Sequence, residues 1–288
     1  MKRLPILALL VLLAACVPGA TVVAPPTFHL LSSELVSLEP PGVGRGAAVV
    51  RLELEVRNPN PIGLRLAGLD GEFYLADRRV AASRFPGGVS IPAQGTGRLT
   101  LDVEAPLERA PHLLAQMARL ATGSAVPYRL DGTLAVEVLG TTQRFPSVTV
   151  ARGELSPLPP LRAPTVRFDA GASGVRLDGL TAVIDVGLAI DNPLILGFWA
   201  RGPQLEIRVD GRPVGRASIP ATPVPARGTS HAVVRVEAGL AELGAALMTR
   251  LQSGGLGLEV GLRGDLAFEI PGVTEIAVDL AGVGGPLR

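Results

Sequence analysis

Alternating apolar and polar residues run through most of this chain and predict β-strands. In residues 51–57 and 184–190 every second side chain is apolar, which is the period of a strand with one buried face. The charged residues between them suit the wet face of an antiparallel sheet. Further strands are expected where the pattern returns, at residues 99–103, 134–138, 205–209, 232–236 and 266–270. The chain is therefore predicted to be mostly β.

Two segments have helical spacing instead. Leu114, Met117 and Leu120 form an apolar stripe between Pro111 and Gly123, which suit the first turn and the end of a helix. Such a stripe packs on a core far more often than it binds a ligand. A second stripe, which precedes Gly254-Gly255, consists of Leu240, Leu243, Leu247 and Leu251.

Four short motifs occur twice in the same order, at offsets of 134, 133, 131 and 132 residues. A drift of three residues over so long a span indicates two copies of one domain. The paired motifs are Asn58-Pro59 and Asn192-Pro193, 92–96 and 225–229, 117–120 and 248–251, and 132–135 and 264–267.

The predicted fold is two tandem antiparallel β-sandwiches of the fibronectin III or immunoglobulin type, each with one α-helix. We expect the first at residues 28–155 and the second at 163–288. A proline-rich linker at 156–162 should join them, and a proline-containing tether at 16–27 should precede them as a semi-rigid spacer.

The N-terminus has the layout of an export signal. Lys2 and Arg3 precede an apolar run at 4–13, which is too short to span a bilayer, and small residues lead to Cys16. This resembles the signal of bacterial lipoproteins, in which cleavage after residue 15 makes Cys16 the acylated first residue; an ordinary signal peptide is the alternative. We therefore expect a lipid anchor at the bacterial cell envelope. Val17 is not the aspartate associated with inner-membrane retention, so in a cell with two membranes the outer membrane is favoured over the inner.

The charge of the chain argues against a nucleic-acid partner, and its cysteine content argues against a disulfide. Without Lys2 and Arg3 the 27 basic residues fall to 25 arginines, against 26 acidic residues. A near-neutral chain with no basic run gives no electrostatic reason to bind nucleic acid. Because Cys16 is the only cysteine, no disulfide is expected.

No pattern indicates catalysis. His29, His112 and His231 are far apart and have no ligands at metal-binding spacing, so we expect no metal site and no cofactor. The glycine-rich run 42–46 precedes a predicted strand, which favours a turn over a phosphate loop. The chain is therefore expected not to be an enzyme.

One family resemblance covers nearly the whole chain after the signal. The strand that runs into Asn58-Pro59-Asn60-Pro61, the hairpin segment 69–76 and the turn 92–95 resemble the water-stress and hypersensitive-response (WHy) domain of the group 2 late embryogenesis abundant proteins. The second copy has Asn192-Pro193 followed by apolar residues 194–196, so it departs from the double Asn-Pro. The resemblance implies a seven-stranded sandwich with a helix and a role in tolerance to drying, heat or osmotic stress.

The physics of the Asn-Pro motif is structural. Proline cannot donate to a sheet and pushes the residue before it out of the helical region, and asparagine can bond nearby backbone groups. Asn58, Pro59, Asn60 and Pro61, and likewise Asn192 and Pro193, are expected to end a strand and fix the turn that follows.

The favoured function is protection under water loss. A lipid-anchored, non-enzymatic protein would protect by contact with the membrane or with client proteins when water is withdrawn. Lipid binding or transfer at the envelope is a second hypothesis, because the apolar surplus could frame a groove. An adhesion or assembly module is a third, since sandwich domains often serve that purpose.

Overall fold

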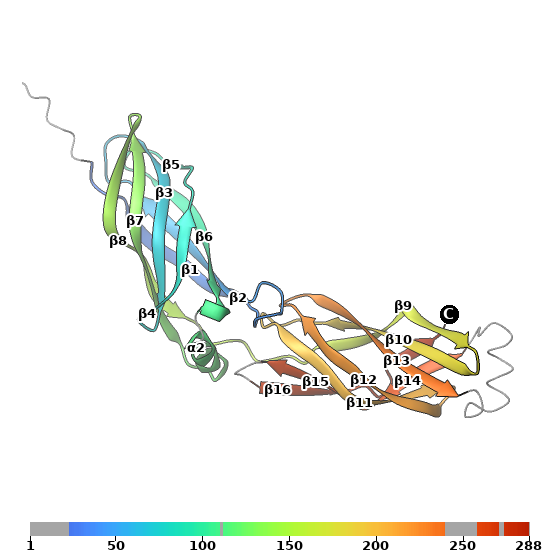
Figure 1. The fold of residues 1–288 in the computed structure, drawn as a ribbon. Coiled ribbons are helices and arrows are strands. Elements are labelled where there is room, and N and C mark those ends of the chain that lie inside the picture. The colour runs from blue at the N-terminus through green and yellow to red at the C-terminus, as the bar shows by residue number, and fades with distance from the viewer. Residues whose placement is uncertain (1–22, 110–111, 240–257, 271–273, 288) are drawn as a thin grey trace, which may run out of the picture.

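The computed structural model describes residues 23–109, 112–239, 258–270 and 274–287. Figure 1 shows two β-rich halves joined end to end, with the β1–β2 loop and one helix near the junction. Strands before Leu155 build two sheets, and strands after Thr165 build two others. The predicted mostly β, sandwich-type fold is confirmed.

The first half consists of a three-stranded and a five-stranded sheet. The three-stranded sheet has the order β1 (Thr27–Leu38), β2 (Ala47–Arg57), β6 (Thr96–Pro106). The other has the order β4 (Arg78–Phe85), β3 (Leu64–Leu75), β7 (Val126–Val138), β8 (Thr141–Leu155), with β5 (Val89–Ile91) also paired to β3.

The second half has a three-stranded and a six-stranded sheet. The first of these has the order β13 (Thr229–Gly239), β10 (Thr181–Asp191), β9 (Thr165–Asp178). The larger one has the order β16 (Thr274–Asp279), β15 (Asp265–Ile270), β11 (Phe198–Val209), β14 (Glu259–Arg263), β17 (Gly284–Pro286), and β12 (Arg212–Val224) pairs with β11.

The alternation in the sequence corresponds to the two faces of these sheets. On β2 the side chains of Leu52, Leu54 and Val56 are fully buried, and the residues between them face outward. The central strands β2 and β10 each pair antiparallel with a neighbour on both sides. Outward-facing residues on paired strands then lie opposite each other and form ion pairs.

A short 3-10 helix η1 (Leu107–Arg109) and the helix α2 (His112–Ala121) follow β6. The predicted helix is therefore present, between the strands expected on either side of it. Leu113 and Leu120 of α2 are buried, and Gly123 at φ +88° ends the helix. The side chains of Leu114 and Met117, and the second predicted helix at 240–251, lie outside the described residues.

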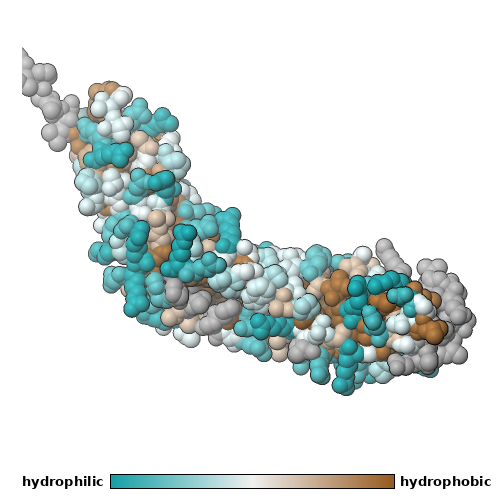
Figure 2. All heavy atoms as spheres, viewed as in Figure 1, coloured by the Kyte–Doolittle hydropathy of each residue, from teal (hydrophilic) through white to brown (hydrophobic). Residues whose placement is uncertain are grey.

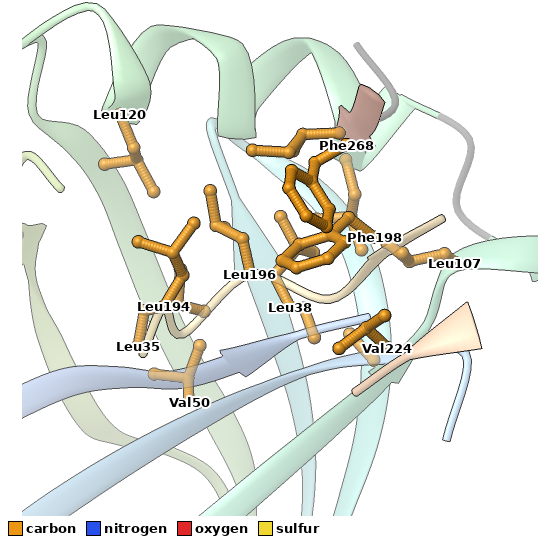
Figure 3. Packing of buried hydrophobic residues seen from close by; sticks show 14 of the residues in the cluster. Leu35, Leu38, Val50, Leu107, Leu120, Leu194, Leu196, Phe198, Val224 and Phe268 are labelled. Atoms are coloured by element: carbon orange, nitrogen blue, oxygen red, sulfur yellow. The ribbon is translucent and has the colours of Figure 1, made fainter. Parts of the chain in front are cut away.

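Buried residues form a continuous cluster that passes through the junction of the two halves. Figure 3 shows Leu35, Leu38 and Val50 of the first half beside Leu194 and Leu196 of the second. Phe198 and Phe268 meet edge to face there, with ring centroids 5.0 Å apart. The sequence patterns did not indicate that apolar residues of the two halves would meet.

Hydrophilic residues cover much of the face shown in Figure 2. Among the described residues, no helix is both long and apolar enough to cross a bilayer.

Candidate functional site

The first Asn-Pro motif forms a loop, which we call the first asparagine loop (residues 58–62), at the end of β2. Asn58 is fully buried, and its side-chain nitrogen donates to the carbonyl oxygens of Ile62 at 2.7 Å and Pro92 at 2.9 Å. Its side-chain oxygen accepts from the backbone N–H of Asn60 at 2.9 Å. Both donors and the acceptor are therefore used, as a buried amide requires.

The second Asn-Pro motif forms an equivalent loop, the second asparagine loop (residues 192–196), at the end of β10. Asn192 donates to the carbonyl oxygens of Leu196 and Pro225, both at 2.8 Å, and accepts from the N–H of Leu194 at 2.9 Å. Asn58 makes the same three hydrogen bonds 134 residues earlier, and its side-chain oxygen also accepts from the side-chain nitrogen of Asn60 at 3.0 Å.

The turn that each loop binds is also the same. The backbone N–H of Asn58 donates to Gly95, and that of Asn192 donates to Gly228, both at 2.9 Å. Gln94 and Arg227, just before those glycines, have φ angles of +52° and +50°. Each asparagine thus fastens the end of one strand to the turn before another, β6 in the first half and β13 in the second.

The prolines lie where the sequence places them, directly after the buried asparagines. Pro59, Pro61 and Pro193 are exposed. They contribute no backbone donor, so the loops do not continue the sheets.

Asn60 does more than the sequence indicated, because it binds the N-terminal segment. Its side-chain oxygen accepts from the N–H of Ala24, and its side-chain nitrogen donates to the carbonyl oxygen of Ala24, both at 2.9 Å. Val23 is 8% exposed. The described end of the predicted tether, residues 23–26, is therefore held against the first half. Cys16 lies outside the described residues.

At the position of Asn60 the second loop has Leu194, which is buried. Leu194 lines a pocket of about 270 Å³ together with Leu158 and Leu161 of the predicted linker. The two linker leucines also pack against the buried cluster, and Leu158 donates its N–H to Leu120. The linker is thus held by apolar contact and a hydrogen bond to the helix, whereas Asn60 holds the N-terminal segment by two hydrogen bonds.

The second asparagine loop also contacts the end of β1, just before the β1–β2 loop (residues 39–46) of the first half. Leu38 donates to the carbonyl of Ile195 at 2.8 Å and accepts from Gly197 at 2.7 Å. This places Leu38 and Leu196 in an isolated parallel β-bridge. Backbone hydrogen bonds therefore join the two halves.

A buried carboxylate completes this junction. Glu39 is 7% exposed, and its two oxygens accept from the backbone N–H of Arg45 at 2.7 Å and of Ala226 at 3.1 Å. Gly44, at φ +51°, lies against this carboxylate, where any Cβ would collide with it. The glycine-rich run 42–46 is the turn that the sequence predicts, and its glycines make room for a contact between the halves.

Ion pairs on the outer faces shift the pKa values of their carboxyl groups. The hydrogen bond from Arg51 holds the pKa of Asp102 below its ordinary value. Hydrogen bonds from Arg235 first, and then from Arg176, lower the pKa of Asp185 in the same direction. Arg51 and Asp102, and likewise Arg235 and Asp185, lie directly opposite each other on paired strands, whereas Arg176 reaches Asp185 diagonally from β9.

The three histidines lie apart, on β1, at the start of α2 and on β13. His231 pairs with Asp169 at 2.9 Å, and the hydrogen bond lowers the pKa of Asp169. Within the part of the chain that the structure describes, no three His, Cys, Asp or Glu side chains are grouped to hold a metal ion.

A shallow hollow of about 600 Å³ on the β3–β7 sheet is lined by charged side chains, including Asp70, Arg84 and Asp131. Its charges suit water and ions better than an acyl chain. Asp70 and Arg84 pair with each other at 2.9 Å.

Comparison with known proteins gives one family. The model described as "Late embryogenesis abundant protein" matches residues 53–149, about a third of the chain. No curated protein matches the chain.

Solved structures share only distant similarity. A protein from Archaeoglobus fulgidus is 11% identical, with 46% of this chain and 96% of that one covered and a TM-score of 0.30. A protein from Arabidopsis thaliana, solved in solution, is 17% identical, with 48% and 86% covered and a TM-score of 0.38. The family match is the informative one: residues 53–149, which include the first asparagine loop and the turn that it binds, resemble the late embryogenesis abundant family.

Proposed function

We propose that this protein is a non-enzymatic protective protein of the bacterial cell envelope, held there by acyl chains on Cys16. The observation that carries the proposal is the match of residues 53–149 to the late embryogenesis abundant family. We infer that both halves are copies of a WHy-type domain, because Asn58 and Asn192 make the same hydrogen bonds in the same order.

The surface supports a role under drying. Cross-strand arginine–carboxylate pairs such as Arg51–Asp102 and Arg235–Asp185, at 2.8 Å and 2.6 Å, need few waters to satisfy them. Exposed pairs contribute little in water, but Coulomb attraction strengthens as the surrounding dielectric constant falls. A fold with its charges paired internally should keep its shape as water is withdrawn, and so should still contact membrane or client proteins.

The anchor follows from the resemblance of the N-terminus to a lipoprotein signal. One acyl chain binds a bilayer only marginally, and two or more give stable residence. Cys16→Ser should therefore shift the protein from the membrane fraction to the soluble or unprocessed fraction. A variant that still sediments fully with membranes would contradict the anchor.

The protective role is tested by deleting the gene and drying or salt-shocking the cells. We expect lower survival than in the parent strain, with rescue by the wild-type gene on a plasmid. Unchanged survival under drying, heat and salt would contradict the proposal.

Lipid binding or transfer remains the second candidate, and the pocket between linker and second asparagine loop is the observation that favours it. Leucines and prolines line much of this pocket, although 270 Å³ is below the usual range for ligand sites. Native mass spectrometry of the purified protein should find no lipid in this pocket. A lipid of defined mass, lost in Leu194→Arg, would favour lipid binding instead.

A further inference from the structure

Three loops meet at the end of the first half that lies away from the second. They are the first asparagine loop with Gly63, the turn 92–95, and the two-residue turn Leu139-Gly140 between β7 and β8. Gly63, Pro92 and Leu139 line one common hollow, so the three loops are neighbours. In Figure 1 this end is the upper one, at the tip of the β7–β8 hairpin. We call it the free end.

The free end carries no charge. Residues 58–64, 86–97 and 138–143 contain no Asp, Glu, Lys or Arg. The loops at the other end of the same sheets do, as at Asp77, Glu108 and Arg45. Entry into a lipid interface would therefore bury no charged side chain of these loops, whereas the loops at the other end would have to lose the hydration of theirs.

Leu139 stands out within this end. Its side chain is 84% exposed, and its φ angle is +51°. The following Gly140 has φ +78°, so the pair forms the left-handed turn in which Asn-Gly is preferred. The turn at the corresponding place in the second half, between β15 and β16 (residues 271–273), lies outside the described residues. A leucine at position 139 strains the backbone and gains nothing from burial, so the fold itself does not explain it.

The chain that leads to Cys16 emerges at this end. Asn60 holds Ala24 there, and seven residue steps separate Val23 from Cys16. Seven extended residues span at most about 25 Å. An acylated Cys16 therefore keeps Val23, and with it the free end, within about 25 Å of the bilayer.

The charges just behind the free end suit a lipid surface. The first charged residues met along the strands that leave these loops are Arg57, Arg65, Arg98, Glu137 and Arg144. Arg65 pairs with Glu137 at 3.9 Å, and the other three arginines leave an excess of positive charge that favours anionic headgroups. Long arginine side chains can reach phosphate while the loops between them lie deeper.

A second copy of the chain is a poorer fit to this surface. The corresponding end of the second half is covered by the eight-residue β1–β2 loop, through Leu38 and Glu39. A second copy that covered the free end in the same way would use its β9–β10 turn, the counterpart of the β1–β2 loop. That turn has only Gly179-Leu180 between its strands. It is too short to supply the same contacts.

We propose that the free end docks on the bilayer that holds the acyl chains of Cys16, with Leu139 entering the interface and Arg57, Arg65, Arg98 and Arg144 at headgroup depth. This inference rests on the proposed lipid anchor. It adds an orientation: the first half stands on the membrane and the second half projects away from it.

The test uses the full lipidated chain in vesicles of phosphatidylethanolamine and phosphatidylglycerol. Because acylation consumes the only cysteine, Leu139→Cys gives a single site for an environment-sensitive fluorophore. Leu180→Cys, at an equally exposed leucine of the second half, is the matched control. Brominated lipids should quench the label at position 139 at least about twofold and leave the label at position 180 unchanged.

The outcomes separate the two claims. Protein that floats with the vesicles but shows equal quenching at both positions overturns the docking of the free end and leaves the anchor standing. Protein that does not float overturns the anchor itself.

A second label at Ala93→Cys tests the role of Leu139 without altering its turn. Adding Leu139→Asn should keep the fold, since asparagine accepts a left-handed φ, and should reduce quenching at position 93. Undiminished quenching there would contradict insertion of Leu139.

Discussion

The two asparagine loops use one set of hydrogen bonds for two different purposes. Asn58 and Asn192 each donate to two carbonyl oxygens and accept from one backbone N–H, at matching positions in the chain. Two residues later the loops differ: Asn60 binds the N-terminal segment, whereas Leu194 packs against the linker. The buried asparagine therefore fixes the shape of each loop. The residue after the proline, Asn60 or Leu194, determines which neighbouring segment the loop contacts.

The largest effect is expected from removing a buried asparagine. Asn192→Ala leaves the carbonyls of Leu196 and Pro225 and the N–H of Leu194 without partners, which should cost about 3 kcal/mol of unfolding free energy. Urea unfolding measures the loss. Asn58→Ala is the matched variant and should cost a similar amount. A loss below about 1 kcal/mol in both would contradict the structural role of the loops.

The next effect concerns the contact of Glu39 with Ala226, in the turn that the second asparagine loop binds. Glu39→Ala leaves the N–H groups of Arg45 and Ala226 unpaired, at a cost of about 2 kcal/mol, and loosens the two halves. Small-angle scattering should show a broader range of particle shapes. Glu39→Gln keeps one acceptor oxygen, so its stability and its range of shapes should lie between those of the wild type and of Glu39→Ala. An unchanged scattering curve for Glu39→Ala would mean that Glu39 does not hold the junction.

Exchanging the residues that differ sharpens the comparison. Asn60→Leu removes both bonds to Ala24, so the Ala24 amide should exchange with deuterium faster, at a cost of about 1–2 kcal/mol. Leu194→Asn puts an amide into an apolar pocket and should also destabilise the protein. Slow exchange at Ala24 in Asn60→Leu would show that other contacts hold the segment.

The smallest effect comes from an ion pair that occurs in both halves with its charges reversed. Arg51 faces Asp102 across β2 and β6, and Asp185 faces Arg235 across β10 and β13. Arg51→Asp places two carboxylates opposite each other and should lower the urea midpoint slightly. Adding Asp102→Arg recreates the order of the second half and should restore the midpoint. Failure of the double variant to recover would mean that the two sites are not equivalent.

These pairs also set a pH dependence. Arginine partners lower the pKa of Asp102 and Asp185 in the folded protein, so the unfolded state binds protons first as the pH falls. The stability from each pair is complete above the ordinary carboxyl pKa of 3.8, and it is lost as the pH falls through the lower folded value. Asp185→Asn should therefore show a weaker loss of stability below pH 4 than the wild type, by urea titration at several pH values.

Much of the fold could be predicted because its strands alternate strictly. Residues 51–57 and 184–190 lie in β2 and β10, where one face is buried along the whole strand. The strand β1 was missed because bulges between Leu30 and Ser32 and between Leu35 and Ser37 shift its alternation. An alternating pattern predicts a regular strand, but a bulge breaks the alternation and hides the strand from this kind of prediction.

The site was predictable only in part. The sequence located Asn58 and Asn192 and indicated that they shape turns. Proline cannot continue a strand ladder, and asparagine can bond the backbone of the turn that follows. It could not show that Asn60 binds Ala24 or that Glu39 binds Ala226, since these partners lie 36 and 187 residues away. Contacts of that range depend on how whole sheets are placed, which no local pattern records.

Survival of dried cells tests most directly whether the protein protects by acting at the membrane. A deletion strain would carry the wild-type gene, the Cys16→Ser variant or an empty plasmid, with matched protein levels. We predict that only the wild-type gene restores survival to the parental level. Full rescue by Cys16→Ser, or a deletion strain that survives drying as well as its parent, would contradict the account.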